Sequence, residues 1–316
     1  MSTATTSVAG GRVQTEVPLA LVGPTASGKT EASILLARRL DAEVVLVDAM
    51  TVYRGMDVGT AKPSAEERGG VPHHLVDVAD PMESFSVARF QALAREALAG
   101  IRDRGRTALL VGGSGLYYRA VVDDLEFPGT DPAVRGELLA EAAAIGPHAL
   151  HRRLADLDPR AAAAMEPSNA RRAVRALEVA ALTGRPFSSF ARGWDRYPGD
   201  RVRAAGIGMP PDVLRARIEA RVRRQLEEGL VDEVAGFLDR GFALTASQAI
   251  GYHEMAEYLA GRWSLQEAAE RIVRRTRALA RRQMAWFRRD PRIRWFEAGP
   301  EGAAALVEEI EEHYLG

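Results

Sequence analysis

Residues 23–30 (GPTASGKT) match the G-x-x-x-x-G-K-[ST] spacing of a phosphate-binding P-loop at every fixed position. In such a loop, backbone N–H groups and the start of the following helix bind phosphate oxygens. Lys29 supplies a positive charge, and the Thr30 hydroxyl reaches a bound Mg²⁺ ion. The pattern predicts a phosphate site formed by Gly23, Thr25, Ala26, Ser27, Gly28, Lys29 and Thr30, with Thr30 as the metal ligand. It leaves the phosphate-bearing molecule open.

The residues on either side of this loop predict the elements that must position it. Residues 17–22 (VPLALV) are apolar and indicate a buried strand, and residues 30–40 (TEASILLARRL) indicate an amphipathic helix. A strand, a glycine loop and a helix in this order direct the helix N-terminus towards a phosphate.

A carboxylate follows the second predicted strand, residues 43–47 (EVVLV). Asp48 therefore lies at the carboxyl end of a parallel strand, where α/β sheets bind their ligands. Its side chain is either a Mg²⁺ ligand or a general base that accepts a proton from a nucleophile. The structural alternative is an aspartate that only caps the following turn. Residues 49–63 are predicted to form a long loop at the same edge.

A third predicted strand, residues 107–111 (TALLV), runs into the sequence Gly-Gly-Ser-Gly. Glycines let the backbone approach a ligand closely, so Ser114 is a candidate to bind a phosphate or a nucleobase. A plain tight turn is the alternative. For His73 and His74 we favour ordinary loop histidines, because no third metal ligand stands at a familiar spacing.

Composition limits the class of protein. The 316 residues contain no cysteine, which excludes disulfides and thiolate metal sites. No apolar run approaches the roughly 20 residues of a membrane span. Residues 1–16 are small and polar and lack the apolar region of a signal peptide, so we expect a disordered tail. These features predict a cytoplasmic enzyme with no membrane contact.

Charge is distributed unevenly along a chain whose net charge is only −1. Residues 262–294 contain eleven arginines and three acidic residues, which predicts a basic face on a nearly neutral protein. Ser264 and Glu267 have the spacing of a capping box and predict the start of a helix over residues 264–290. This arginine-rich helix is suited to bind RNA phosphates.

The order of the predicted elements indicates an α/β fold with a P-loop NTPase-like parallel sheet flanked by helices. Residues 17–123 and 201–316 form this core, with a further helix over residues 212–230 and basic helices near the C-terminus. After a break near Pro128 and Gly129, the segment 124–200 is rich in Ala and Arg and is predicted to be an all-helical insertion.

Several motifs together resemble the bacterial tRNA dimethylallyltransferase family. Between residues 17 and 297 they are GPTASGKT, VDAMTVYRGMDVGTAKP, PHHLVDVADP, LLVGGSGLYYRA, RRAVRALE, RIEAR, QAIGY and RRQMAWFR. The resemblance implies transfer of a dimethylallyl group from dimethylallyl diphosphate to N6 of the adenosine 3′-adjacent to the anticodon, with Mg²⁺ as cofactor. A P-loop that holds a leaving diphosphate fits a chain whose strand 107–111 ends in glycine rather than in a second carboxylate.

The resemblance also implies roles for individual residues. Asp48, Ser114 and Lys29 are the catalytic set, and Arg217 and Arg221 join the P-loop in binding diphosphate. The insertion is implied to clamp the anticodon stem-loop, whose target base is extruded from its stack. The implied tRNA-binding residues are Asp48, Ala49, Met50, Thr51, Ser114, Arg135, Arg171, Arg172, Arg175, Gln248, Gly251, Tyr252, Arg281 and Arg282.

One departure from the family pattern bears on base recognition. The family often has Asp-Ser-x-Gln after the second strand, and this chain has Asp48-Ala49-Met50-Thr51. The contact made by the family's glutamine therefore does not carry over to Thr51.

Three other functions are compatible with parts of the sequence. A small-molecule kinase would use ATP, with Asp48 activating a hydroxyl, but it would not need the insertion or the arginine helix. An adenylate isopentenyltransferase would prenylate free AMP and would need no tRNA clamp. A non-catalytic RNA-binding protein would not need the intact Asp48, Lys29 and Thr30. We expect the protein to act as a monomer.

Overall fold

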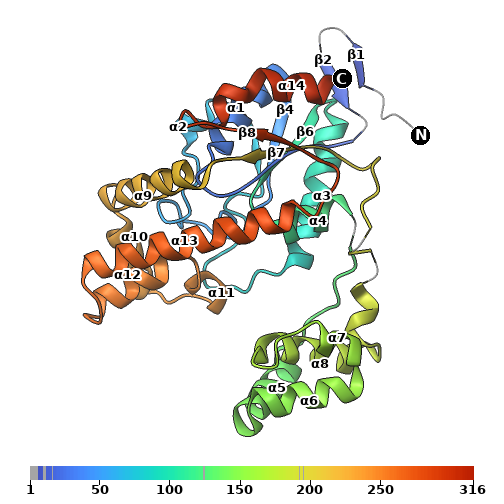
Figure 1. The fold of residues 1–316 in the computed structure, drawn as a ribbon, viewed down its shortest axis with the longest axis vertical. Coiled ribbons are helices and arrows are strands. Elements are labelled where there is room, and N and C mark those ends of the chain that lie inside the picture. Colours follow the sequence, from blue (N-terminus) through green and yellow to red (C-terminus); the bar gives the residue numbers. More distant parts are fainter. Residues whose placement is uncertain (1–5, 10–11, 16, 124, 192, 195) are drawn as a thin grey trace. The chain divides into compact units, whose positions relative to one another are not determined.

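The computed structural model describes the chain except for residues 1–5, 10–11, 16, 124, 192 and 195 (Figure 1). The chain forms two compact units. The first comprises residues 1–122 and 198–316, and the second comprises residues 123–197. The expected boundaries of the helical insertion were residues 124 and 200.

Six strands of the first unit form one parallel sheet in the order β5-β4-β6-β3-β7-β8. Their bounds are β3 (Leu19–Val22), β4 (Ala42–Leu46), β5 (His73–His74), β6 (Thr107–Gly112), β7 (Arg203–Gly208) and β8 (Ile293–Glu297). This sheet confirms the predicted α/β class. Because β3, β4 and β6 are neighbours and parallel, the loops that follow them meet at one edge of the sheet.

Helices surround this sheet. They are α1 (Lys29–Arg39), α2 (Ala65–Arg68), α3 (Val87–Asp103), α4 (Gly115–Val122), α9 (Pro211–Glu227), α10 (Leu230–Leu238), α11 (Leu244–Ser247), α12 (Tyr252–Leu259), α13 (Leu265–Phe287), the 3-10 helix η2 (Ala303–Leu306) and α14 (Val307–Leu315). Among the described residues, none of these helices combines the length and apolarity that crossing a bilayer requires.

Two helix boundaries show how sequence sets local structure. The predicted capping box at the start of α13 is confirmed, because Ser264 and Glu267 exchange side chain-to-backbone hydrogen bonds. The single helix predicted over residues 212–230 was wrong at its end. Gly229 adopts a φ of 92°, which breaks the helix and starts α10 in a new direction.

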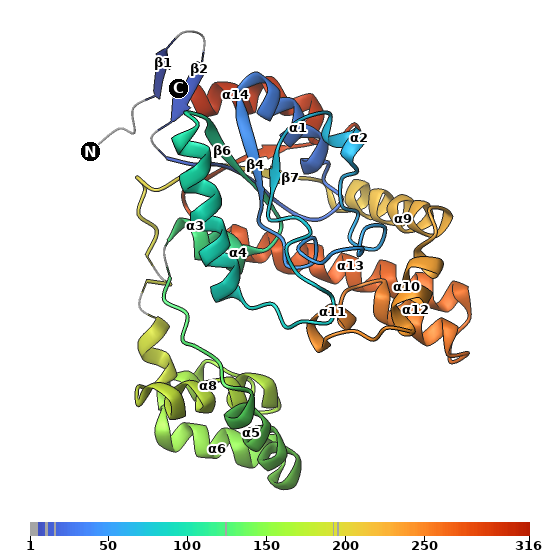
Figure 2. The same ribbon diagram turned by 180° about the vertical axis from the view of Figure 1, so that it is seen from behind.

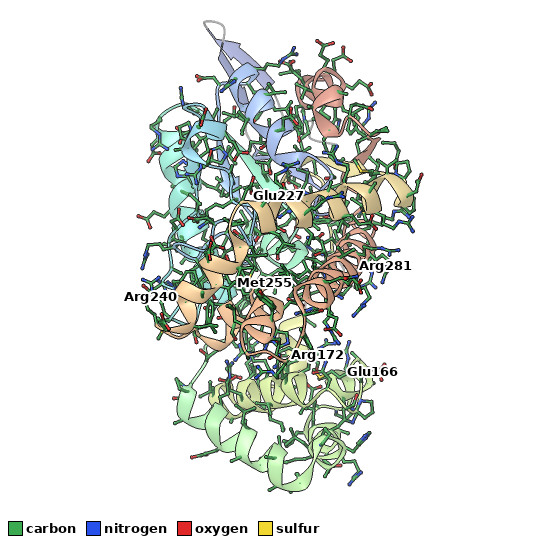
Figure 3. All side chains as sticks on the ribbon, turned by 90° about the vertical axis from the view of Figure 1, so that its left-hand side faces the viewer. Glu166, Arg172, Glu227, Arg240, Met255 and Arg281 are labelled. Carbon is green, nitrogen blue, oxygen red and sulfur yellow. The ribbon has the colours of Figure 1, made fainter. Side chains whose placement is uncertain are left out.

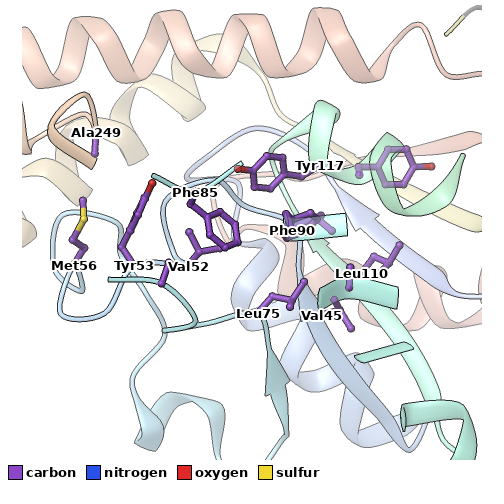
Figure 4. Packing of buried hydrophobic residues seen from close by; sticks show 14 of the residues in the cluster. Val45, Val52, Tyr53, Met56, Leu75, Phe85, Phe90, Leu110, Tyr117 and Ala249 are labelled. Atoms are coloured by element: carbon purple, nitrogen blue, oxygen red, sulfur yellow. The ribbon is translucent and has the colours of Figure 1, made fainter. Parts of the chain in front are cut away.

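Strand β3, in the interior of the sheet, packs on both faces because successive side chains of a strand point to opposite sides. Leu19 and Leu21 pack with α1, η2 and α14, whereas Ala20 and Val22 pack in the cluster that includes α3, α4 and α13. Figures 1 and 2 show α1 and α14 on one side of the sheet and α3 and α4 on the other. The second cluster continues under the loop at residues 52–56, where Val52, Tyr53 and Met56 are buried (Figure 4).

The second unit is helical, as predicted for the insertion. It contains α5 (Pro132–Ile145), α6 (Pro147–Leu157), α7 (Pro159–Ala163), α8 (Ala170–Thr183) and the 3-10 helix η1 (Phe187–Ala191). Asp131, Asp158 and Asn169 cap the N-termini of α5, α7 and α8 with their side-chain oxygens. A small apolar core that includes Leu150 and Leu154 joins these helices.

The N-terminal segment differs from the expected disordered tail. Residues Thr6–Ala9 (β1) and Arg12–Thr15 (β2) form an antiparallel pair. Threonine and valine favour strands, and the two runs are separated in the sequence by two glycines, a composition typical of hairpins. The prediction was wrong for these eight positions. Residues 1–5, 10–11 and 16 lie outside the described residues.

Candidate functional site

A pocket of about 410 Å³ lies where the loops after β3, β4 and β6 meet α9 and α13. It brings together eight residues that sequence analysis singled out: Thr25, Asp48, Ala49, Met50, Ser114, Arg221, Gln248 and Arg282. The other residues that line it are Gly59, Thr60, Gly113, Val222, Gln225, Ala249, Ile250, Ile272, Arg275, Thr276, Ala278, Leu279 and Gln283. The described structure thus joins the P-loop, the strand-end carboxylate and the arginine helix in one cavity.

The P-loop glycines hold a backbone that other residues would strain. Gly23 has a φ of 145°, and a Cβ atom there would lie 2.7 Å from the carbonyl oxygen of Ile207. Gly28 has a φ of 87° and would place a Cβ atom 2.9 Å from the backbone nitrogen of Ala303. Glycine is therefore required at both positions to bring the loop against β7 and η2.

Lys29 is buried at the start of α1. Its Nζ atom donates to the carbonyl oxygen of Pro24 at 2.5 Å and to Oγ of Ser27 at 3.4 Å. Burial, with a smaller effect of the charge of Arg221, lowers the pKa of Lys29 to about 7, against an opposing effect of Asp48. The ammonium therefore lacks a full countercharge within the described structure, as a site for an anion requires.

Two arginines on α9 reach the loop from the side. Arg217 donates from Nε to the carbonyl oxygen of Ala26 at 2.9 Å, and Arg221 donates to Oγ1 of Thr25 at 3.1 Å. Arg221 also donates to the carbonyl oxygen of Thr60 at 3.2 Å. Burial lowers the pKa of Arg221. The structure places both arginines beside the P-loop, where the resemblance located them.

Asp48 accepts two hydrogen bonds from the turn that follows it. The backbone N–H groups of Met50 and Thr51 donate to Oδ1 at 2.8 and 3.3 Å. Among the described residues, no hydrogen bond reaches Oδ2. One oxygen therefore caps the turn, as the structural alternative predicted, and the other is available in the pocket. Thr51 is buried and its hydroxyl has no partner in the described chain, whereas Ala49 and Met50 line the cavity.

The Gly-Gly-Ser-Gly turn after β6 lets three elements approach closely. A Cβ atom at Gly112 would lie 2.3 Å from the carbonyl oxygen of Val47, and one at Gly115 would overlap the Trp286 ring. Ser114 lies between these glycines, and its N–H donates to the carbonyl oxygen of Val47 at 3.3 Å. The turn thus brings Ser114 beside the end of β4, in the pocket with Asp48.

Sequence reasoning missed the face that α13 presents to the pocket. Gln283 is the clearest example, since its Oε1 atom accepts from the N–H of Thr25 at 2.8 Å and its amide packs against Gly113. The pocket-lining positions on α13 recur at the helical period, so they lie on one face: Ile272, Arg275, Thr276, Ala278, Leu279, Arg282 and Gln283. The helical period of the sequence predicts that these residues share one face of α13. Only the fold shows that this face lines the pocket.

A partly buried hydrogen-bond network supports the far wall of the pocket. Glu233 on α10 accepts hydrogen bonds from the N–H groups of Asp57, Val58 and Gly59 at 2.8 to 3.0 Å. The hydroxyl of Tyr252 also donates to Glu233. Gln225 on α9 donates to the carbonyl oxygens of the same loop. The loop that carries Thr60, a partner of Arg221, is therefore fixed by α9 and α10.

Two residues that were predicted to contact tRNA, Tyr252 and Gly251, are buried next to this network. Tyr252 is only 1% exposed, and its ring lies against Gly59, where a Cβ atom would clash with it. Gly251 is buried and adopts a φ of 100° at the start of α12. Direct tRNA contact by these two residues stays a prediction, because in this structure the Tyr252 side chain points into the protein and Gly251 is buried. Gln248, at the other end of the motif, is exposed and lines the pocket.

Glu233→Gln is expected to loosen the loop over residues 57–59 and to lower the melting temperature. An amide cannot accept all four hydrogen bonds, and each buried donor left unpaired costs about 1–3 kcal/mol. Hydrogen exchange of the amides at residues 57–59 measures the effect directly. Glu227→Gln, an exposed change on α9 (Figure 3), is the matched control. Unchanged protection of these amides in the Glu233 variant would contradict the assigned support.

The predicted tRNA-binding arginines fall into two groups. Arg135 and Arg175 donate to the buried carboxylate of Glu178 at 2.7 and 2.8 Å. Burial alone would raise the pKa of Glu178, but these hydrogen bonds outweigh it and lower the pKa. The structure thus gives these two arginines an internal role in joining α5 to α8.

The remaining predicted arginines are exposed. Within the part of the chain that the structure describes, Arg171 and Arg172 on α8 make no side-chain hydrogen bond or ion pair, and Arg281 and Arg282 on α13 make none either. Figure 3 shows Arg172 and Arg281 at the surfaces of their units. The N–H donors of these four guanidinium groups are therefore exposed to solvent and not used within the described chain.

The two histidines support the sheet edge. His73 and His74 form β5, and Nε2 of His74 bonds to the carboxylate of Glu43 at 2.7 Å. Nδ1 of His73 bonds to the carbonyl oxygen of Val71 at 2.8 Å, and burial lowers the pKa of His73. Among the described residues, no cluster of three metal-ligating side chains occurs. The preference for ordinary structural histidines fits these contacts.

Comparisons with known proteins agree along most of the chain. The IPP transferase family profile matches residues 51–290, and the isopentenyl transferase profile matches residues 17–79. A tRNA dimethylallyltransferase from Kineococcus radiotolerans is 52% identical over 302 residues, which cover 93% of this chain and 94% of that protein.

Solved structures give the same result. The crystal structure of a tRNA isopentenylpyrophosphate transferase from Bacillus halodurans has a TM-score of 0.69 and 45% identity, covering 95% of each chain. A eukaryotic dimethylallyltransferase, whose crystal structures show it acting on tRNA, has a TM-score of 0.75 at 25% identity, covering 89% of this chain and 74% of that one. With a family profile across most of its length and relatives this similar, the chain belongs to the IPP transferase family.

Proposed function

We propose that this protein transfers a dimethylallyl group from dimethylallyl diphosphate to N6 of the adenosine 3′-adjacent to the anticodon in tRNA. The observation that carries the proposal is one pocket in which the Asp48 carboxylate shares a wall with Thr25 of the P-loop and with Arg221. A cationic loop suits a diphosphate leaving group, and a carboxylate suits an amine that must lose a proton. Relatives named tRNA dimethylallyltransferase and a structural neighbour acting on tRNA support this substrate pair.

The leaving group determines what the P-loop must do. As the bond between the allylic carbon and the diphosphate oxygen breaks, negative charge grows on the diphosphate. Lys29, Arg217 and Arg221 and the loop N–H groups are already in place to stabilise that charge. Because these groups are held by contacts within the protein, little reorganisation accompanies the reaction.

The acceptor determines the role of Asp48. The N6 amine of adenine forms the new bond to the allylic carbon, and a proton of that amine passes to Oδ2 of Asp48. Binding Oδ1 to the turn at Met50 and Thr51 fixes the carboxylate while leaving Oδ2 for the amine. Ser114, in the same pocket, is placed to hydrogen-bond the extruded base.

Mg²⁺ fits the residues that are present. Mg²⁺ prefers oxygen ligands and usually combines one or two protein oxygens with substrate phosphates and water. Thr30, exposed at the first turn of α1, offers such an oxygen, and the described chain contains no competing cluster of metal-ligating side chains. When bound, the ion neutralises charge on the diphosphate. Thr30 is its proposed protein ligand.

The exposed arginines of both units are the proposed contacts for the anticodon stem-loop. Arg281 and Arg282 extend the basic surface of α13, and Arg171 and Arg172 lie on the helical insertion. Guanidinium groups bind phosphates in a fixed, often bidentate geometry. A clamp by the insertion, action as a monomer and a cytoplasmic location belong to this proposal.

Transfer of label from dimethylallyl diphosphate tests the function directly. Unmodified tRNA, free AMP and ATP are offered in parallel to the wild-type protein. Label in tRNA alone is the expected result. Label in AMP would instead identify a nucleotide-level isopentenyltransferase. Hydrolysis or transfer of the ATP γ-phosphate without any labelled product would indicate a kinase and would overturn the proposal.

A further inference from the structure

A second cavity of about 440 Å³ adjoins the pocket that contains Asp48. The two cavities share Gln248 and Arg275, so one opens beside the other. The remaining residues that line the second cavity are His253, Glu254, Trp263, Arg271 and Arg274. It lies within the first unit, between α12 and α13, and none of the residues proposed to bind diphosphate line it.

An arginine on an aromatic ring dominates this cavity. The guanidinium carbon of Arg271 lies 4.0 Å from the centre of the Trp263 ring. The His253 ring meets Trp263 edge-on, with the ring centres 5.9 Å apart and the planes at 88°. Trp263 is half-buried and packs against the hydrophobic core. The ring therefore fixes the position of the guanidinium before any ligand arrives.

The neighbouring charges separate structural from available groups. Arg275 donates to the carboxylate of Glu254, at 2.5 Å, and to the carbonyl oxygen of Gln248, so it is held in the wall. Arg274 is exposed and has no side-chain partner among the described residues. The side-chain amide of Gln248 likewise makes no bond within the described chain. The cavity thus contains the fixed planar guanidinium of Arg271, the unpaired guanidinium of Arg274 and the unpaired side-chain amide of Gln248, as far as the described residues show.

This set of groups matches a nucleotide more closely than a simple anion. A phosphate alone would be bound by cations and would gain nothing from an aromatic support. A planar base stacks on a guanidinium plane, and an amide reads a base edge by hydrogen bonds. A nearby arginine then binds the phosphate of the same nucleotide.

We propose that this cavity binds the nucleotide directly next to the target adenosine in the RNA strand. The base stacks on Arg271, which Trp263 supports, and Arg274 contacts the adjoining phosphate. The occupant is a neighbour of the target because a strand leaving the Asp48 pocket past Gln248 and Arg275 enters this cavity next. The inference rests on the proposed function for the identity of the RNA.

Equilibrium binding of anticodon stem-loop RNA to the complete protein tests the subsite. Three RNAs are compared: intact, abasic at the 5′ neighbour of the target, and abasic at the 3′ neighbour. Arg271→Lys keeps the charge and removes the planar platform. We expect Arg271→Lys to weaken binding of the intact RNA roughly 5- to 20-fold. Binding of the RNA that lacks the base occupying this cavity should weaken less than about 2-fold. Trp263→Phe should give a smaller loss with the same dependence on that base.

Arg102→Lys is the matched control. Arg102 is exposed in the last turn of α3, immediately before β6 begins, and therefore lies at the sheet edge opposite the pocket. The Arg102→Lys variant should bind all three RNAs with the affinity of the wild-type protein. An equal loss for all three RNAs in the Arg271 variant, or no loss, overturns the subsite.

The two proposals fail separately in this design. RNA binding is measured without dimethylallyl diphosphate, so base-dependent losses uphold the subsite even if the wild type transfers no label. Label transfer to tRNA together with losses that do not depend on either base would overturn the subsite and leave the proposed function intact.

Discussion

Asp48→Asn is expected to lower kcat for dimethylallyl transfer by about 10²- to 10⁴-fold, the range typical of a lost general base. Asparagine retains a side-chain oxygen for the N–H groups of Met50 and Thr51, so the turn after β4 stays formed. It cannot take a proton from the adenine amine. Single-turnover rates at saturating RNA and dimethylallyl diphosphate measure the chemical step.

The control for Asp48→Asn is a measurement of RNA binding by the variant protein. Affinity for the anticodon stem-loop should change less than about 5-fold, because one hydrogen bond to a neutral base contributes about 1 kcal/mol. Near-normal turnover with normal binding would show that Asp48 only caps the turn. Ser114→Ala should cost less than Asp48→Asn, because it removes a hydrogen bond and not the proton acceptor.

Lys29→Met is expected to lower kcat/KM by about 10²- to 10³-fold, the size of effect seen when one stabilising group at a developing charge is removed. Methionine fills the buried volume with a similar unbranched side chain, so loss of fold is not expected. The measurement is kcat/KM for dimethylallyl diphosphate at fixed tRNA. Retention of more than about half of the activity would exclude a role for the ammonium at the leaving group.

The lowered pKa of Lys29 adds a pH dependence with a defined sign. The pKa is about 7 before the anion binds, and a bound diphosphate favours the charged form and raises it. Affinity for an inert diphosphate analogue should therefore be constant below pH 7 and fall by up to about 10-fold per pH unit above it. Lys29→Met should remove this dependence, which separates it from any titration of the ligand. A flat wild-type profile between about pH 7 and 9 would contradict the assignment.

The QAIGY motif shows what a motif leaves open about its residues. Tyr252 belongs to a motif that resembles the family, and its sequence neighbour Gln248 does line the pocket. A motif specifies spacing along the chain but not which side chain turns inward. Burial of Tyr252 against Gly59, with its bond to Glu233, shows that this side chain supports a loop. Arg135 and Arg175 likewise have a role that their motif does not specify, since both donate to Glu178 inside the insertion.

The P-loop, the parallel strands, the start of α13 and the family were all predictable from the sequence. These features depend on local spacing, on the two-residue period of strands and on capping residues, all of which act over a few positions. The residues that complete the site depend on contacts between distant segments. Thr25 and Gln283 are 258 positions apart, and Thr25 and Arg221 are 196 apart. Only the packing of α9 and α13 against the sheet brings these groups together, because no local pattern encodes which distant side chain will meet a given backbone N–H.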